Sequence, residues 1–115
     1  MDNAQLLKGI LEGCVLAVIA RGETYGYEIL GVLEEAGFRD IGEGTLYPVL
    51  TRLDKNRMIE CRLAKSPLGP VRKYYAVTAL GRESLEAFRE RYRAISASAE
   101  SILFTGGGRG VKPWA

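Results

Sequence analysis

Apolar residues recur at helical spacing in four stretches of the chain and alternate with other residues in two more. The helical stretches are residues 5–20, 25–36, 43–56 and 79–103, and the alternating stretches are residues 59–64 and 71–77. A run of turn-forming residues, Ser-Pro-Leu-Gly-Pro at 66–70, separates the alternating stretches and predicts a β-hairpin. The pattern therefore predicts a mainly α, α+β domain with three helices, a hairpin and a long final helix.

The first predicted helix is apolar on two faces and so needs two packing partners. Its apolar residues are Leu7, Leu11, Cys14 and Val18 on one face, with Ile10, Val15, Leu16 and Ile19 beside them. Gly9, Gly13 and Ala17 recur at every fourth residue. They either form a ridge that admits a neighbouring helix closely or merely soften the helix. Thr24 is the expected N-cap of the second helix, and Gly37 is expected to end it.

The third predicted helix has an apolar stripe and a polar face. The stripe consists of Leu46, Val49, Leu50 and Leu53, and the opposite face carries Thr45, Tyr47, Pro48, Thr51, Arg52 and Lys55. Hydroxyl groups and cations of this kind suit base edges and phosphates in a DNA major groove. An ordinary half-buried surface helix has the same pattern. Pro48 predicts a bend or a late first turn, because proline removes one helical hydrogen bond.

The hairpin follows this helix directly, and its tip is flanked by Lys65, Arg72 and Lys73. A groove-sized helix followed by a basic hairpin is typical of a winged helix, in which the wing contacts the adjacent DNA backbone or minor groove. Tyr25 and Tyr27 lie at the start of the second helix, where either can reach a phosphate or one of them can pack in the core.

The formal net charge of +2 is unevenly distributed. Residues 1–43 hold 8 acidic and 3 basic side chains, whereas residues 44–82 hold 8 basic and 2 acidic ones. A solvated basic face is the simplest explanation of such a block. Because the block coincides with the third helix and the hairpin, we interpret it as a surface for DNA phosphates.

The composition argues against an enzyme. The chain has no histidine, which removes Ser-His and Cys-His nucleophile pairs and most zinc sites, so we expect no catalytic residue, metal or cofactor. Cys14 and Cys61 occupy apolar periodic positions and are predicted to be buried, reduced thiols. No apolar run approaches the roughly 20 residues that cross a bilayer, and no basic leader precedes the first helix, so we expect a cytoplasmic protein.

Several motifs, in this order and at these spacings, resemble the PadR family of bacterial winged-helix transcriptional regulators. They are Gly-Tyr-Glu-Ile at 26–29, Gly-Thr-Leu-Tyr-Pro-Val-Leu at 44–50, Arg-Leu at 52–53, Gly-Pro at 69–70, Arg-Lys-Tyr-Tyr at 72–75 and Thr-Ala-Leu-Gly at 78–81. The resemblance covers roughly residues 6–103 and is closest to the short branch of the family, which has a single C-terminal helix. It implies a homodimeric DNA-binding protein, usually a repressor, whose affinity for a pseudo-palindromic operator can be tuned by a small aromatic or drug-like effector.

The resemblance also assigns parts of the chain. Residues 1–78 are expected to form the DNA-binding domain, residues 79–104 a dimerisation helix and residues 105–115 a disordered tail. The expected DNA-binding residues are Tyr27, Thr45, Tyr47, Pro48, Thr51, Arg52, Lys65, Arg72 and Lys73. Family members commonly place glycine where this chain has Arg57, so we expect Asn56 to adopt the left-handed conformation and Arg57 to face DNA.

The last predicted helix, which Thr78 is expected to cap, carries a broken apolar stripe longer than the winged core can cover. The stripe consists of Leu80, Leu85, Phe88, Tyr92, Ile95, Ala99 and Ile102, and it predicts packing against a second subunit. Tyr92, with Phe88 beside it, matches the position at which drug-binding relatives place an effector-stacking aromatic residue; alternatively, Tyr92 simply packs in the interface. Other hypotheses for the whole chain are a winged helix that binds protein and a ligand sensor that does not bind DNA.

Overall fold

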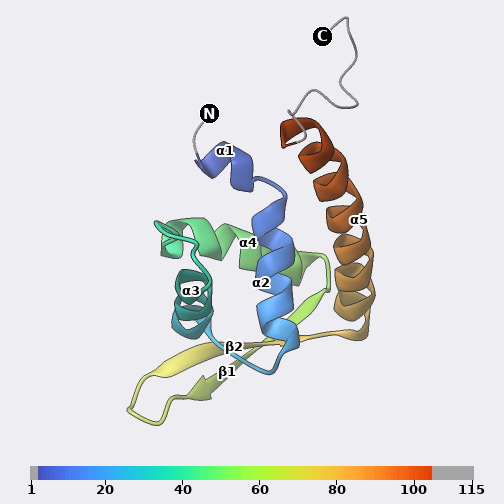
Figure 1. Ribbon diagram of the computed structural model, residues 1–115. Coiled ribbons are helices and arrows are strands. Elements are labelled where there is room, and N and C mark those ends of the chain that lie inside the picture. Colours follow the sequence, from blue (N-terminus) through green and yellow to red (C-terminus); the bar gives the residue numbers. More distant parts are fainter. Residues whose placement is uncertain (1–2, 105–115) are drawn as a thin grey trace, which may run out of the picture.

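The computed structural model describes residues 3–104, which fold into five helices and a two-stranded antiparallel sheet (Figure 1). The elements are α1 (Asn3–Leu7), α2 (Ile10–Ala20), α3 (Gly26–Glu35), α4 (Glu43–Lys55), β1 (Ile59–Lys65), β2 (Val71–Val77) and α5 (Ala79–Leu103). The helix order and the β-hairpin between α4 and α5 confirm the predicted winged helix. Among the described residues, no helix is long and apolar enough to cross a membrane.

Helix α2 lies at the centre and packs against α3, α4, α5 and β2. The buried core comprises Leu11, Val15, Leu16, Ile19, Ile29, Leu33, Leu46, Val49, Leu50, Leu53, Ile59, Tyr75 and Leu85. All four predicted apolar positions of α4 belong to this core. Their burial turns the opposite, polar face of α4 towards solvent.

The predicted first helix is interrupted, so the expectation of one helix over residues 5–20 is wrong. Gly9 adopts a left-handed backbone with φ 88° and separates α1 from α2. Gly9 therefore does not belong to a small-residue ridge. Gly13 does provide close approach, because a Cβ at Gly13 would overlap the ring of Phe88 in α5.

The predicted cap of the second helix is also wrong. Tyr25 is the N-cap residue of α3, and Thr24 instead pairs with β2, where its N–H and C=O bond to Tyr75 at 3.1 and 2.8 Å. The Thr24 hydroxyl donates to Glu28. The segment entering α3 is thus fixed to the edge of the sheet. Gly37, with φ 110°, ends α3 as predicted.

Helix α4 begins after Gly42 and continues through Pro48 to Lys55, so its first turn does not start late. Its end differs from the prediction, because Asn56 has φ −86° and Arg57 takes the left-handed conformation with φ 63°. The N–H groups of Arg57 and Met58 bond to the carbonyls of Asp54 and Leu53 at 3.0 and 2.9 Å. This is the hydrogen-bond pattern of a Schellman motif, which requires a left-handed residue at this register even without glycine.

The hairpin pairs Ile59 with Val77 at its base and Lys65 with Val71 near its tip. The base is covered by helices, whereas the outer part projects beyond them (Figure 1). Cys61 and Leu63 are consequently exposed, so the prediction of a buried thiol is wrong for Cys61. Cys14 is half-buried in α2, and this burial raises the pKa of its thiol.

Helix α5 spans the predicted residues, and Thr78 caps it as predicted by accepting a hydrogen bond from the Gly81 N–H at 3.0 Å. Leu85 is buried, but the helix then extends away from the other elements (Figure 1). Ile95 is 70% exposed and Ile102 is 80% exposed. An apolar stripe is therefore left uncovered, as the sequence predicts. The predicted disordered tail lies outside the described residues.

Candidate nucleic-acid interface

The polar face of α4 forms the centre of the candidate interface. Thr45, Pro48 and Thr51 are exposed, and Tyr47 is 40% exposed. The Thr51 hydroxyl donates to the Tyr47 carbonyl at 2.9 Å, so the lone pairs of the hydroxyl oxygen remain available to accept a hydrogen bond. Pro48 has no N–H to offer the Gly44 carbonyl, but Gly44 is exposed and water can serve that carbonyl.

Helix α3 holds one flank of this face. The Tyr47 hydroxyl lies where a Cβ at Gly26 would be 2.9 Å away, so the small Gly26 makes room for the ring. Tyr27 is 69% exposed, and its hydroxyl donates to a Glu43 carboxylate oxygen at 3.1 Å. This hydrogen bond raises the pKa of Tyr27. Tyr27 does not pack in the core, since its ring lies in solvent beside the first turn of α4, whereas Tyr25 is half-buried.

Arg52 lies on the other flank, which faces α2. Its Nε is 2.9 Å from a Glu12 carboxylate oxygen, and the Arg52 side chain remains 56% exposed. The structure therefore separates Arg52 from the outward-facing Thr51. To reach a base edge, Arg52 has to leave Glu12.

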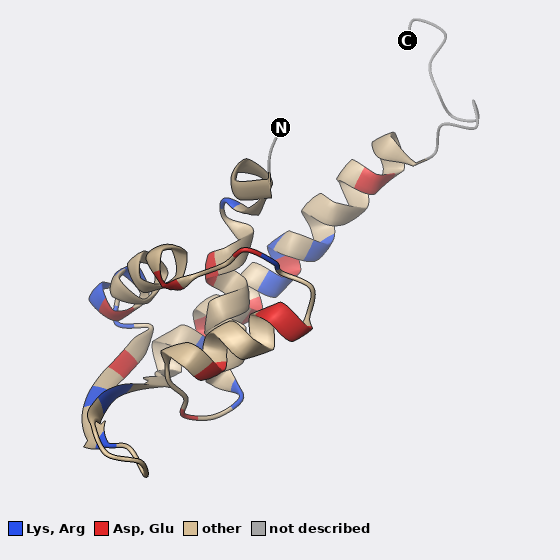
Figure 2. Cartoon of the chain, turned by 90° about the vertical axis from the view of Figure 1, so that its left-hand side faces the viewer, with Lys and Arg blue, Asp and Glu red and all other residues tan. Residues whose placement is uncertain are grey.

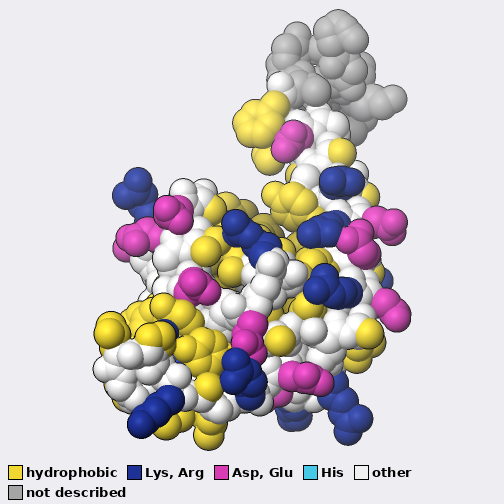
Figure 3. Space-filling view, turned by 90° about the horizontal axis from the view of Figure 1, so that it is seen from below, with side chains coloured by type: hydrophobic (Ala, Val, Ile, Leu, Met, Phe, Trp, Pro, Cys, Tyr) yellow, Lys and Arg dark blue, Asp and Glu magenta, His cyan; other side chains and the backbone are white. Residues whose placement is uncertain are grey.

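The three predicted cations of the wing lie on two opposite faces of the hairpin. Successive side chains of a strand point to opposite faces, so Arg72 and Lys73 cannot act on the same side of the hairpin. Lys73 pairs with Leu63 and Lys65 pairs with Val71, which places both exposed lysines on one face. Figure 2 shows lysine and arginine positions along the hairpin, and Figure 3 shows charged side chains of both signs among apolar surface on the lower side of the molecule.

Arg72 is half-buried on the opposite face of the hairpin. Its guanidinium carbon lies 3.9 Å from the centroid of the Tyr25 ring and 5.9 Å from that of Tyr74. The two rings meet edge to face with centroids 5.8 Å apart. Stacking of this kind fixes the guanidinium plane and leaves its edge free to bind a phosphate.

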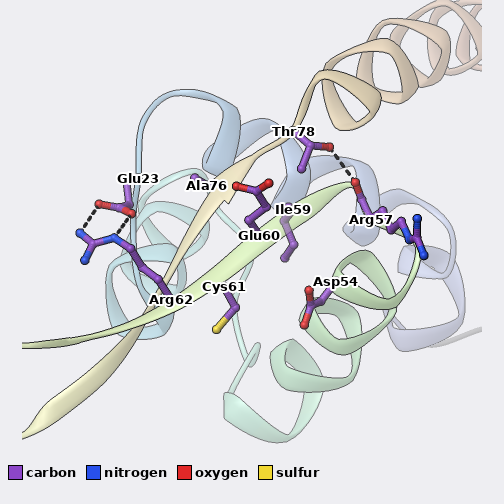
Figure 4. A pocket seen from close by; sticks show the side chains of 9 residues that line it. All are labelled: Glu23, Asp54, Arg57, Ile59, Glu60, Cys61, Arg62, Ala76 and Thr78. Carbon is purple, nitrogen blue, oxygen red and sulfur yellow. Dashed lines mark hydrogen bonds and ion pairs between the residues drawn. The ribbon is translucent and has the colours of Figure 1, made fainter.

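A second arginine joins this face. Arg62 donates two hydrogen bonds to the Glu23 carboxylate, at 2.6 and 2.7 Å, and lies 5.2 Å from the Tyr74 centroid. The hydrogen bond from Arg62 lowers the pKa of Glu23. Figure 4 shows this pair at one end of a cavity of about 530 Å³. We name Glu23, Tyr25, Arg62, Arg72 and Tyr74 the wing-root cluster, because they join both strands to the segment before α3.

The wing-root cluster is not apparent from the sequence pattern. Glu23 and Arg62 are 39 residues apart, and apart from their opposite charges the sequence holds no signal that they meet.

The cluster and the Glu12–Arg52 pair also change the charge of the basic block, residues 44–82. Two of its arginines are neutralised by carboxylates from the acidic first third of the chain. Within residues 3–104, the wing lysines Lys65 and Lys73 form no ion pair.

The two candidate effector residues lie together on α5. Phe88 is half-buried against Gly13, and its ring stacks on that of Tyr92 with centroids 6.1 Å apart and an interplanar angle of 25°. Tyr92 is 47% exposed. In the part of the chain that the structure describes, no group of three or more cysteine, aspartate or glutamate residues is placed to hold a metal ion.

The chain is similar in sequence and in fold to known proteins of one family. Residues 15–87 match the transcriptional regulator PadR-like family. A PadR-like transcriptional regulator from Bacillus cereus is 44% identical with a TM-score of 0.78, and the match covers 87% of this chain and 97% of that one. A Streptococcus transcriptional regulator is 46% identical with a TM-score of 0.76, over 85% of this chain and 96% of that one. Bacillus subtilis PadR, solved in complex with operator DNA, is 25% identical with a TM-score of 0.62, over 69% of this chain and 46% of that one.

Proposed function

Because this chain belongs to the PadR-like family of transcriptional regulators, we propose that it binds duplex DNA in a sequence-specific way and represses transcription by occupying a promoter. The observation that carries the proposal is the exposed polar face of α4 beside a wing whose Lys65 and Lys73 form no ion pair with any other described residue. Bacillus subtilis PadR, which shares the fold, is solved with operator DNA and supports the same conclusion.

Each part of the interface has a distinct role in the proposal. Helix α4 enters the major groove, where Thr51 and Tyr47 hydrogen-bond to bases or phosphates and Thr45 and Pro48 line the approach. Arg52 reads a base once it leaves Glu12. Lys65 and Lys73 neutralise DNA phosphates beside the groove. The stacked Arg72 and the exposed Tyr27 bind other phosphates of the DNA backbone.

We further propose that residues 1–78 bind DNA and that residues 79–104 form a homodimer through the uncovered stripe of α5. A two-fold dimer places one α4 in each of two major grooves about 34–36 Å apart. Removal of the chain from Tyr92 onward should abolish the dimer, because it deletes Ile95 and Ile102. A truncated chain that sediments as a folded dimer would place the interface elsewhere.

Selection of binding sites from random duplex DNA tests the proposed function. We expect enrichment of an inverted repeat whose half-sites are about 10–10.5 base pairs apart, centre to centre. The same pool passed over the truncated chain is the control and should yield no paired half-sites. If the full chain retains no duplex even at low salt, the DNA-binding proposal fails.

An aromatic effector is part of the proposal, with Tyr92 and Phe88 as its binding residues. Rings from two subunits can enclose a flat molecule, and each aromatic contact contributes about 0.5–1.5 kcal/mol beyond buried area. Such a ligand releases DNA if it binds the DNA-free dimer more tightly. A panel of planar aromatic compounds is titrated against the wild type and Tyr92→Ala. Binding that is indifferent to Tyr92, or absent, removes this part of the proposal and leaves DNA binding intact.

A further inference from the structure

The base of α5 is fixed firmly to the winged core. The Thr78 N–H donates to the Met58 carbonyl at 3.0 Å, and the Thr78 hydroxyl donates to the Arg57 carbonyl at 2.7 Å. A Cβ at Gly81 would overlap the Met58 carbonyl, so the first turn of α5 lies directly on this backbone. With its base fixed and Leu85 buried in the core, the direction of the rest of α5 depends on a second point, where the helix lies against α2.

That second point is the contact between Gly13 of α2 and Phe88 of α5. The Phe88 ring occupies the space of a Cβ at Gly13, so it sits deeper against α2 than any other residue at position 13 would allow. A small cavity of about 130 Å³ adjoins the ring, lined by Leu16, Leu53 and Met58 among others. The ring therefore has room to move if position 13 gains a methyl group, and α5 can tilt without the core being lost.

From this geometry we infer that the Gly13–Phe88 contact sets the spacing between the two operator half-sites that the protein prefers. The inference rests on the proposed function, because it requires a dimer formed by α5 with one α4 in each groove. Phe88 and Leu103 are 15 residues apart in α5, a lever of about 22 Å at 1.5 Å per residue. A tilt of about 10° at Phe88 displaces the end of the helix by about 4 Å, which is close to the 3.4 Å rise of one base pair.

Helix α4, the proposed reading helix, packs against the same part of α2. Leu16 of α2 and Leu53 of α4 both belong to the buried core, and both line the small cavity beside Phe88. The same part of α2 therefore fixes the orientation of α4 and the direction of α5. A change at Gly13 alters the angle between the dimerisation helix and the reading helix and leaves the α4 side chains as they are.

The experiment uses the full chain, the selected operator and derivatives with one or two base pairs inserted or deleted between the half-sites. For the wild type we expect one preferred spacing and a loss of affinity when a base pair is inserted or deleted between the half-sites. In Gly13→Ala, the spacing of highest affinity should shift by at least one base pair. Affinity for a duplex with a single half-site should stay unchanged, which separates spacing from base reading.

Gly31→Ala is the matched control. Gly31 also lies within a helix, but a Cβ there has no atom within 4 Å, so the spacing preference should stay that of the wild type. Phe88→Leu removes the wedge without adding atoms and should also change the spacing profile. Adding Phe88→Leu to Gly13→Ala should return the profile towards that of the wild type, since the smaller side chain makes room for the methyl group.

Three results would overturn the inference. They are a wild type that tolerates every spacing equally, a folded dimeric Gly13→Ala with the wild-type profile, and a Phe88→Leu variant with the wild-type profile. The last result decides the matter even if Gly13→Ala does not fold. A wild type that binds no duplex at all refutes the proposed function instead, so the two failures are distinct.

Discussion

The ion pair between Glu12 and Arg52 makes a quantitative prediction about DNA reading. In the free protein, Glu12 holds the guanidinium that we propose reads a base, so carboxylate and DNA compete for Arg52. The two side chains are 37% and 56% exposed, and an exposed pair of this kind contributes about 0.2–1 kcal/mol. A base contact made by arginine in the major groove discriminates by about 1–3 kcal/mol. Arg52 therefore binds DNA in preference to Glu12, and the pair with Glu12 weakens the free energy of DNA binding by at most about 1 kcal/mol.

The variants follow from these magnitudes. Arg52→Ala should weaken binding to the selected duplex by about 5–150-fold, the equivalent of 1–3 kcal/mol, and affect a scrambled duplex much less. Glu12→Gln should strengthen specific binding by up to about fivefold, because Arg52 is released. The double variant should bind like Arg52→Ala alone. Fluorescence anisotropy with a labelled duplex measures all three against Glu86→Gln, which breaks the Glu86–Arg89 pair on α5 and should leave affinity unchanged.

Two outcomes would refute this reasoning in different ways. If Glu12→Gln weakens specific binding as much as Arg52→Ala does, the pair positions α4 and Arg52 reads nothing. If Arg52→Ala weakens the selected and scrambled duplexes equally, Arg52 contacts phosphate alone.

Three further predictions concern the backbone, the wing and the core. Arg57→Gly should raise the free energy of unfolding by about 1 kcal/mol, because glycine adopts φ 63° without strain. Asn56→Gly, at φ −86°, should not stabilise the protein, and denaturant titration measures both variants. Lys73→Ala should reduce the slope of log affinity against log salt by about 1. Arg93→Ala, on the exposed part of α5, should leave the slope unchanged. Burial raises the pKa of Tyr75 to about 12. Since the folded state then holds this proton more tightly, stability should be constant below about pH 10 and fall as the pH rises towards 12, and Tyr75→Phe should remove that decline. An unchanged slope or an unchanged pH profile in the respective variant contradicts the assignment.

Regular patterns in the sequence predicted the fold well. The apolar stripe of α4, the hairpin, and the bounds and cap of α5 are all confirmed, because burial at periods of 3.6 and 2 dominates the energetics of each element. Local backbone choices were harder to predict. Asn56 tolerates the left-handed conformation better than arginine, yet Arg57 adopts it, because Thr78 fixes the carbonyls of Arg57 and Met58 from 20 or more residues away.

The candidate site was predictable only where it follows from the periodic spacing of residues along one element. Helical spacing alone places Thr51 and Pro48 on the open face of α4. It does not reveal that Arg52 pairs with Glu12 or that Arg72 stacks on Tyr25, since both contacts join segments far apart in the chain. Cys61 shows the converse limit, because strand alternation gives the face on which a side chain lies without showing whether another element covers it.

The central claim, that α4 and the wing read duplex DNA, is tested most directly by one ratio. It is the dissociation constant for a scrambled duplex divided by that for the selected duplex of the same length and composition, at a single physiological salt concentration. A sequence-specific regulator predicts a ratio of at least about 10³. Equal affinity for the two duplexes would contradict sequence reading by α4 and would reduce the interface to a basic surface.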